Sequence, residues 1–330
     1  MTDTITGKVL ITGASGFIGS WLRDTLLEQG ADVIAIRRPG SPEAKTGRSV
    51  EASYDDLGSL ERVMEREQPD YVLHVAGATK GRTYQDFERG NVMPTENLLR
   101  AAEAVHPDLK RFVHISSLAA YGPSRPGQPL RETDPRRPVE FYGESKLASE
   151  RTVERAAVPY TIIRPSGVYG PRDVDMFELF KLARSRVNLF FGNRESWGSF
   201  VYVDDVVRAI LQAAASPTTV GRGYFLADGE PITWDTLQAD IQAVVGRRAL
   251  TVSLPKQMPF VAGVLGELAT RIDGQPRLMN RQKAIMGAQE AWTCHAEAAA
   301  ADFGFTPSVP RREALARTHA WYEANGWYGR

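Results

Sequence analysis

Short apolar runs recur along the first half of the chain, and each is followed by a segment whose apolar residues have helical spacing. The runs are rich in β-branched residues and only a few residues long, which is typical of strands buried on both faces. They are Lys8–Thr12, Ala31–Ile36, Asp70–Gly77, Arg111–Ser117 and Tyr160–Pro165. Strands that alternate with helices predict an α/β fold with a doubly wound parallel sheet.

The first strand leads directly into a glycine-rich turn, Gly13-Ala14-Ser15-Gly16-Phe17-Ile18-Gly19, and then into the helical run Ser20–Gln29. Glycines permit a tight turn and a close approach of the backbone to a pyrophosphate, and the following helix N-terminus offers unpaired N–H groups. The strand–turn–helix context therefore predicts a dinucleotide site. A glycine-rich turn with a purely structural role is the alternative.

A tyrosine and a lysine stand four residues apart in the segment 141–150, which we expect to be helical. Four residues make just over one helical turn, so Tyr142 and Lys146 should emerge from the same face. On spacing alone, a pair on a solvated face is the simpler interpretation. The context favours chemistry, because the turn at 13–19 and the serines Ser116 and Ser117 fall at the carboxyl edge of the same predicted sheet.

Together these motifs resemble those of the extended short-chain dehydrogenase/reductase family, the NAD-dependent epimerase/dehydratases. The resemblance spans nearly the whole chain and implies a Rossmann-type fold and an NAD(P)-dependent oxidoreductase. It also implies a catalytic triad of Ser117, Tyr142 and Lys146. Tyr142 would exchange a proton with the substrate oxygen, Lys146 would lower the pKa of that phenol and reach the nicotinamide ribose, and Ser117 would bind the substrate oxygen.

The same resemblance implies a set of coenzyme contacts, most of them just after predicted strands. The set is Gly13, Ser15, Gly16, Phe17, Ile18, Arg37, Arg38, Ser53, Tyr54, Ala76, Gly77, Lys80, Asn91, Ser116, Tyr142, Lys146, Pro165 and Val168. Lys80 is equally consistent with an ordinary loop lysine, and Ser53 stands where the family usually has an aspartate.

Arg37 and Arg38 end the second strand, where an NAD-preferring relative would place an acidic residue for the ribose hydroxyls. A guanidinium at this position can pair with the 2′-phosphate of NADP. NADP(H) is therefore favoured over NAD(H). Two solvated arginines at a strand end are the alternative.

The second half of the chain leaves the predicted sheet after Pro165 and returns to it near Phe200–Val207. This predicts two interleaved domains. Residues 1–165 with about 200–228 would form the NAD(P)-binding Rossmann domain, and about 166–199 with 229–330 a smaller α+β substrate domain. The segment 291–307 should form a final helix and turn, followed by an aromatic tail.

Substrate contacts can be assigned only weakly, to Thr79, Leu118, Ser166, Met176 and Phe177. Met176 and Phe177 lie in the expected helix Asp175–Arg186 and are more consistent with ordinary core packing. Residues 259–272 have apolar residues at helical spacing, which suits packing on the second domain better than an apolar pocket or a membrane surface.

The residues at two positions, Gly167 and Gly198, distinguish between the candidate activities. Nucleotide-sugar epimerases and dehydratases usually have Asn where Gly167 stands and Arg near Gly198, and a diphosphate needs such anchors. Residues 163–173, 228–234 and 254–272 instead resemble the 3-beta-hydroxysteroid dehydrogenase and sterol dehydrogenase branch. The expected function is NADP(H)-dependent interconversion of a secondary alcohol and a ketone, on a steroid, flavanonol or similar apolar substrate. The alternative is a nucleotide-sugar 4-epimerase or 4,6-dehydratase with tightly bound NAD(P). A non-catalytic NADP-binding regulator is disfavoured because all three triad residues are kept.

Composition narrows the remaining possibilities. The 330 residues carry 40 basic and 40 acidic side chains, which gives no electrostatic case for nucleic acid. No apolar run approaches the roughly 18 residues of a spanning helix. Cys294 is the only cysteine, so a reducing cytoplasm is expected, and the five histidines lack metal-site spacing. We expect a small-molecule substrate and, by analogy with the family, a homodimer.

Overall fold

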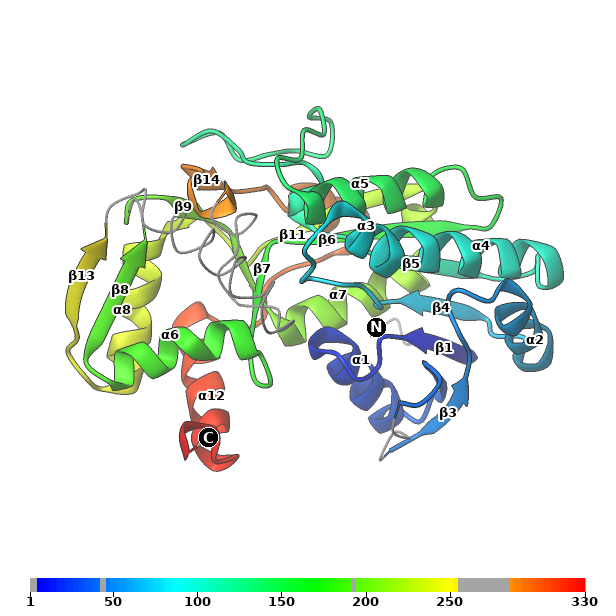
Figure 1. Cartoon of the computed structure of the whole chain (residues 1–330), viewed down its shortest axis with the longest axis horizontal. Helices are drawn as coiled ribbons and strands as arrows, with labels where there is room; N and C mark the ends of the chain where they lie inside the picture. The colour runs from blue at the N-terminus through cyan, green and yellow to red at the C-terminus, as the bar shows by residue number, and fades with distance from the viewer. Residues whose placement is uncertain (1–4, 42–45, 192–193, 255–284, 330) are drawn as a thin grey trace.

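A seven-stranded parallel sheet forms the centre of the protein, as a computed structural model describes it for residues 5–41, 46–191, 194–254 and 285–329 (Figure 1). The strand order is β11-β6-β5-β4-β1-β2-β3, and every neighbouring pair is parallel. The order reverses between β1 and β4, which is where such sheets bind ligands. The predicted doubly wound sheet is confirmed. Its strands are β1 (Lys8–Thr12), β2 (Asp32–Arg37), β3 (Arg48–Glu51), β4 (Tyr71–His74), β5 (Arg111–Ile115), β6 (Tyr160–Pro165) and β11 (Arg222–Leu226).

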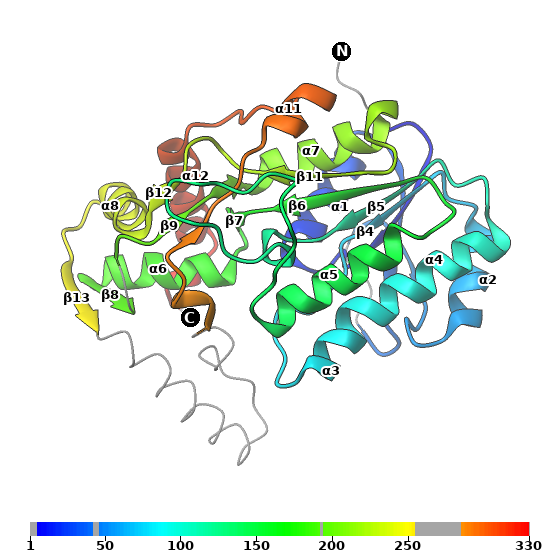
Figure 2. The same ribbon diagram turned by 90° about the horizontal axis from the view of Figure 1, so that it is seen from above.

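Helices cover both faces of this sheet because its strands are apolar on both sides (Figure 2). One face carries α1 (Phe17–Glu28) and α7 (Val203–Ala215). The other carries α2 (Leu57–Glu67), α4 (Met93–Val105) and α5 (Phe141–Val153). A short helix α3 (Tyr84–Phe87) and a π-helical turn (Glu88–Val92) lead into α4.

The remaining elements build a second lobe beside the sheet, on the left of Figure 1. Its helices α6 (Val174–Arg184), α8 (Trp234–Val245) and α12 (Arg311–Ala324) pack around an aromatic cluster. Three small sheets accompany these helices: β7 (Gly167–Tyr169) with β10 (Phe200–Tyr202), β9 (Trp197–Gly198) with β12 (Ile232–Thr233) and β14 (Ala291–Trp292), and, at the outer edge of the lobe, β8 (Val187–Phe191) with β13 (Leu250–Leu254). Helix α11 (Glu297–Phe303) and the 3₁₀ turns 118–120, 217–219 and 327–329 complete the described elements.

The structure differs from the sequence expectation at three places. The edge strand β3 was not expected, because Val50 is its only large apolar residue. The segment 291–307 is a short strand and a seven-residue helix, and the last helix is α12, whose buried face is made largely of Ala314, Leu315, Thr318 and Tyr322. Strand β10 pairs with β7 instead of joining the central sheet. The expected helix 259–272 lies outside the described residues.

Within the described ranges, no helix is both long enough and apolar enough to cross a bilayer. This agrees with the lack of a long apolar run in the sequence.

A buried ion pair fastens α5 to the sheet. The Glu150 carboxylate is fully buried, and Arg164 of β6 donates to it from Nε at 2.9 Å and from Nη2 at 3.1 Å. Arg136 approaches the same carboxylate at 3.1 Å. The Arg164 guanidinium also lies over the Tyr121 ring, 5.0 Å from its centroid. A buried charge is tolerated only while its partners remain beside it. The ion pair therefore fixes the carboxyl-terminal end of α5 against the sheet.

We therefore predict that Glu150→Gln lowers the free energy of unfolding by about 3 kcal/mol, because it leaves the buried Arg164 charge without a carboxylate. Arg151→Gln on the exposed side of the same helix should change it by less than about 0.5 kcal/mol. Urea unfolding followed by circular dichroism measures both. Equal losses in the two variants would contradict the role given to the ion pair.

Candidate active site

The three predicted catalytic side chains come together at the carboxyl edge of the sheet. Lys146 is buried, and its Nζ donates to the carbonyl oxygen of Ile115 at 2.8 Å. Burial lowers the pKa of Lys146 to about 8, against the opposing charge of Glu150. Burial raises the pKa of Tyr142 to about 12, and a hydrogen bond with the Ser117 side chain opposes that rise. Serine, phenol and ammonium thus share one site.

The electrostatics differ from the expectation that Lys146 would lower the pKa of Tyr142. The ammonium is directed to the Ile115 carbonyl, and desolvation of the phenol is the largest influence on Tyr142. At neutral pH the phenol is therefore protonated. A protonated phenol is the form that can donate a proton to a carbonyl oxygen.

Glu140 holds the backbone of the catalytic helix at its first turn. Its two carboxylate oxygens accept from the N–H groups of Tyr142 and Gly143, each at 2.6 Å. Burial raises the pKa of Glu140 to about 7, although both amide hydrogen bonds oppose the rise. A side chain at Gly143 would place Cβ 2.4 Å from the Ala119 carbonyl oxygen. Sequence reasoning missed Glu140, since glutamate is not one of the usual N-cap residues.

Asn91 lies in the π-helical turn before α4 and connects the loop after β4 to α5. Its Oδ1 accepts from Ala78 N–H at 2.7 Å, and its Nδ2 donates to Ser145 Oγ at 2.8 Å. A Cβ on Gly77 would lie 2.9 Å from Asn91 Oδ1 and 3.2 Å from Lys146 Nζ. The Ala76–Gly77 turn therefore passes directly over the buried amide and ammonium.

The glycine turn is held by contacts that glycine alone allows. Gly13 has a φ of +70°, and a Cβ there would lie 2.6 Å from the Ala76 nitrogen. A Cβ on Gly19 would lie 2.1 Å from the Gly13 carbonyl oxygen. Helix α1 begins directly after Gly16, and glycine has no side chain that could cap the N–H groups at the start of the helix. These groups are therefore available to a phosphate.

A buried hydrogen-bond chain that sequence reasoning missed supports this turn. Thr12 Oγ1 accepts from Ala76 N–H at 3.0 Å and lies 2.8 Å from His74 Nδ1. His74 Nε2 lies 2.9 Å from Thr95 Oγ1, which donates to the Asn91 carbonyl. Burial lowers the pKa of His74 to about 3, and the Lys146 charge acts in the same direction. The only signal in the sequence was a histidine within an apolar strand.

The residues at this edge suit a bound dinucleotide. The hydroxyls of Ser116 and Ser166 are buried without a hydrogen-bond partner in the described part of the chain, at the ends of the adjacent strands β5 and β6. Ser15 and Gly16 are exposed at the start of α1. The Tyr54 phenol reaches Thr12 and the Gly13 backbone, and burial raises the pKa of Tyr54 to about 12. A bound coenzyme would offer partners to these two hydroxyls.

The other predicted residues are placed as follows. Phe17 and Ile18 begin α1 and are half-buried, Ala76 and Val168 are half-buried, Leu118 and Pro165 are buried, and Arg38 and Thr79 are exposed. Ser53 Oγ accepts from Asp55 N–H at 3.3 Å, Arg37 pairs with Glu51, and Lys80 lies 3.9 Å from Asp175. Met176 and Phe177 belong to the aromatic core of the second lobe, where Phe177 packs on Tyr322 and Trp327. No cluster of metal-binding side chains occurs in the described residues.

We predict that His74→Gln changes how stability depends on pH. The folded-state pKa of about 3 lies below the ordinary 6.5, so the unfolded chain binds the proton more tightly. The wild-type stability that comes from a neutral His74 is full above about pH 6.5 and is lost as pH falls toward 3. The wild-type advantage over His74→Gln should therefore shrink by up to about 1.4 kcal/mol per pH unit in that window. Urea unfolding of both proteins between pH 4 and 7 measures it, and a constant gap would contradict the buried neutral histidine.

Comparison with known proteins identifies the family to which the chain belongs. The model of the NAD dependent epimerase/dehydratase family matches residues 9–226. A ceramide reductase of Caulobacter vibrioides is 29% identical, over 99% of this chain and 98% of the length of the reductase. A dTDP-6-deoxy-L-talose 4-dehydrogenase (NAD(P)(+)) of Kitasatospora kifunensis is 34% identical over 64% of this chain and 71% of its own.

A solved structure shares the fold. The UDP-glucose 4-epimerase of Thermotoga maritima superposes with a TM-score of 0.78, at 24% identity, over 96% of this chain and 99% of that one. The family expected from the glycine turn and from Tyr142 and Lys146 is confirmed, and with it an NAD(P)-dependent enzyme of this type. The chain belongs to the NAD dependent epimerase/dehydratase family.

Proposed function

We propose that the protein is an NADP(H)-dependent oxidoreductase that interconverts a secondary alcohol and a ketone on an apolar substrate, such as a steroid or flavanonol. Tyr142 serves as the proton donor in reduction and the acceptor in oxidation. Ser117 holds the substrate oxygen near the phenol, and Lys146 supplies positive charge below it. A bound nicotinamide would supply or accept the hydride.

The observation that carries this proposal is the position of Phe200. Its buried ring lies so close to Gly167 and Gly198 that a Cβ on either glycine would be 2.9 Å from the ring. The ring is fixed from another side by Trp234, with centroids 5.3 Å apart. The two positions at which nucleotide-sugar enzymes usually carry Asn and Arg are therefore glycines packed on an apolar ring, and neither offers a side chain to a diphosphate. An apolar ring between two glycines favours a substrate without a diphosphate.

The protonation state of the site supports reduction. A phenol whose pKa is raised to about 12 by burial holds its proton at neutral pH and can donate it to a carbonyl oxygen. One relative, which matches along 99% of the chain, is named ceramide reductase. Both points agree with a ketone as the substrate to be reduced.

We propose that residues 1–165 with about 200–228 hold the coenzyme and that the remainder surrounds the substrate. Ser15 and Gly16 would face the pyrophosphate, Tyr54 the adenosine side, and Ser116 and Ser166 the nicotinamide side. Arg37 and Arg38 would meet the 2′-phosphate of NADP. A homodimer and a cytoplasmic location complete the proposal, and the buried single cysteine Cys294 suits the latter.

The alternative is a nucleotide-sugar 4-epimerase or 4,6-dehydratase. It is supported by the structural likeness to a UDP-glucose 4-epimerase and by a relative named for a dTDP-sugar. The two activities separate in one experiment. Ketosteroids, flavanonols, aliphatic ketones and nucleotide sugars are incubated with NADPH or NADH, and the loss of reduced-coenzyme absorbance is followed. A ketone reductase oxidises one coenzyme for each product, whereas an epimerase converts its sugar without net change.

We predict that Tyr142→Phe lowers kcat by about 10²- to 10⁴-fold, because it removes the proton donor. Coenzyme affinity, measured by calorimetry, should change by less than about threefold, since the pyrophosphate is assigned to the glycine turn and not to the phenol. The matched control is Tyr160→Phe, at the amino end of β6 and away from the site. Turnover retained by Tyr142→Phe would refute the assignment.

A further inference from the structure

Arg37 and Glu51 face each other at the carboxyl ends of two neighbouring strands. Arg37 ends β2, Glu51 ends β3, and the two are register partners in the parallel sheet. Arg37 Nη1 lies 2.5 Å from Glu51 Oε2 and also donates to the Ser41 carbonyl at 3.1 Å. The side chains are 24% and 47% exposed, so the pair is reachable by a ligand.

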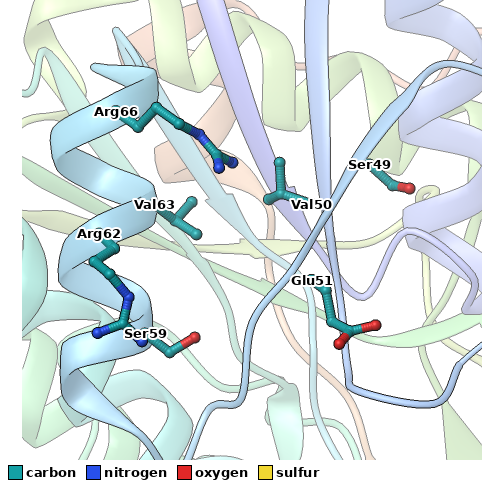
Figure 3. A pocket seen from close by; sticks show the side chains of 7 residues that line it. All are labelled: Ser49, Val50, Glu51, Ser59, Arg62, Val63 and Arg66. Carbon is teal, nitrogen blue, oxygen red and sulfur yellow. The ribbon is translucent and has the colours of Figure 1, made fainter.

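Glu51 stands at the rim of a hollow between β3 and α2, and it does not pair with the arginines across that hollow (Figure 3). Arg62 and Arg66 form the wall that α2 contributes. Their guanidinium groups approach Asp56 at 3.7 Å and Glu67 at 2.9 Å. The Glu51 carboxylate is therefore paired with Arg37 and can interact with a ligand that binds beside Arg37.

An acidic residue was expected after β2 in an NAD-specific protein, and the sequence has arginine there. The fold supplies a carboxylate at the same place from the neighbouring strand. Arg37 is thus already neutralised by Glu51, and the exposed Arg38 is the next residue along the chain. A 2′-phosphate would have to displace the Glu51 carboxylate from Arg37, whereas ribose hydroxyls could donate to it.

We propose that Glu51 is the residue that sets the choice between the two coenzymes. It competes with a 2′-phosphate for Arg37 and accepts from a free 2′-hydroxyl, so the protein binds NAD(H) as well as NADP(H). This inference rests on the proposed dinucleotide site at the glycine turn. The opposite role, in which Glu51 orients Arg37 toward the phosphate, makes the opposite prediction.

The test is calorimetric titration of the wild type and of Glu51→Gln with 2′,5′-ADP, 5′-AMP, NADP⁺ and NAD⁺, none of which requires a known substrate. Glu51→Gln should bind 2′,5′-ADP and NADP⁺ about three- to tenfold more tightly, and 5′-AMP and NAD⁺ equally or less tightly. The gain should shrink as salt screens the charges. Glu65→Gln, which removes an exposed carboxylate from α2, is the matched control and should leave all four affinities unchanged.

A double-mutant cycle identifies the partner. In an Arg37→Gln background, Glu51→Gln should no longer improve 2′,5′-ADP binding, because the competition for Arg37 is gone. Weaker 2′,5′-ADP binding by Glu51→Gln, or the same gain in both backgrounds, would overturn the proposal. If the wild type binds neither NADP⁺ nor NAD⁺, the dinucleotide site itself is refuted, whereas unchanged affinities in Glu51→Gln refute only the role of Glu51.

Discussion

The burial of the Lys146 ammonium against the Ile115 carbonyl fixes α5 on the end of β5, and the other groups of the site are positioned relative to it. A buried cation is tolerated only where an acceptor meets it, so the helix has little freedom to rotate or slide. Glu140 holds the first turn of the helix, and Glu150 with Arg164 holds its last turns. Tyr142 lies between these contacts. The position of the reactive phenol therefore depends on Lys146, on Glu140 and on the Glu150–Arg164 ion pair.

Two buried groups in the site respond to acid in opposite directions. The folded-state pKa of Glu140, about 7, is above its ordinary value, so its contribution to stability is greatest below about pH 4.5 and is lost as pH rises toward 7. His74 contributes in the other sense, since its pKa is lowered to about 3. Between about pH 4.5 and 6.5 the two effects offset each other.

The sequence was sufficient for features set by local spacing. The glycine turn at 13–19 and the pair Tyr142 and Lys146 are recognised within one turn and one helix, and the alternation of strands and helices predicts the sheet. It was insufficient where strand register decides the contacts. The Arg37–Glu51 pair requires knowing that β3 exists and pairs in parallel with β2, and β3 carries almost no apolar signal. The same holds for His74, whose partners lie on β1 and α4. The hydrogen bond from Lys146 to the Ile115 carbonyl likewise depends on tertiary packing, which local spacing does not reveal.

The packing of Phe200 between Gly167 and Gly198 bears on how such a protein could change over evolutionary time. Introducing an asparagine or arginine at either glycine would strain the ring, and truncating the ring alone would open a cavity beside Trp234. Each single substitution at these three positions is therefore expected to cost stability. The three positions are therefore coupled, and a larger side chain at either glycine would require a compensating change of the ring.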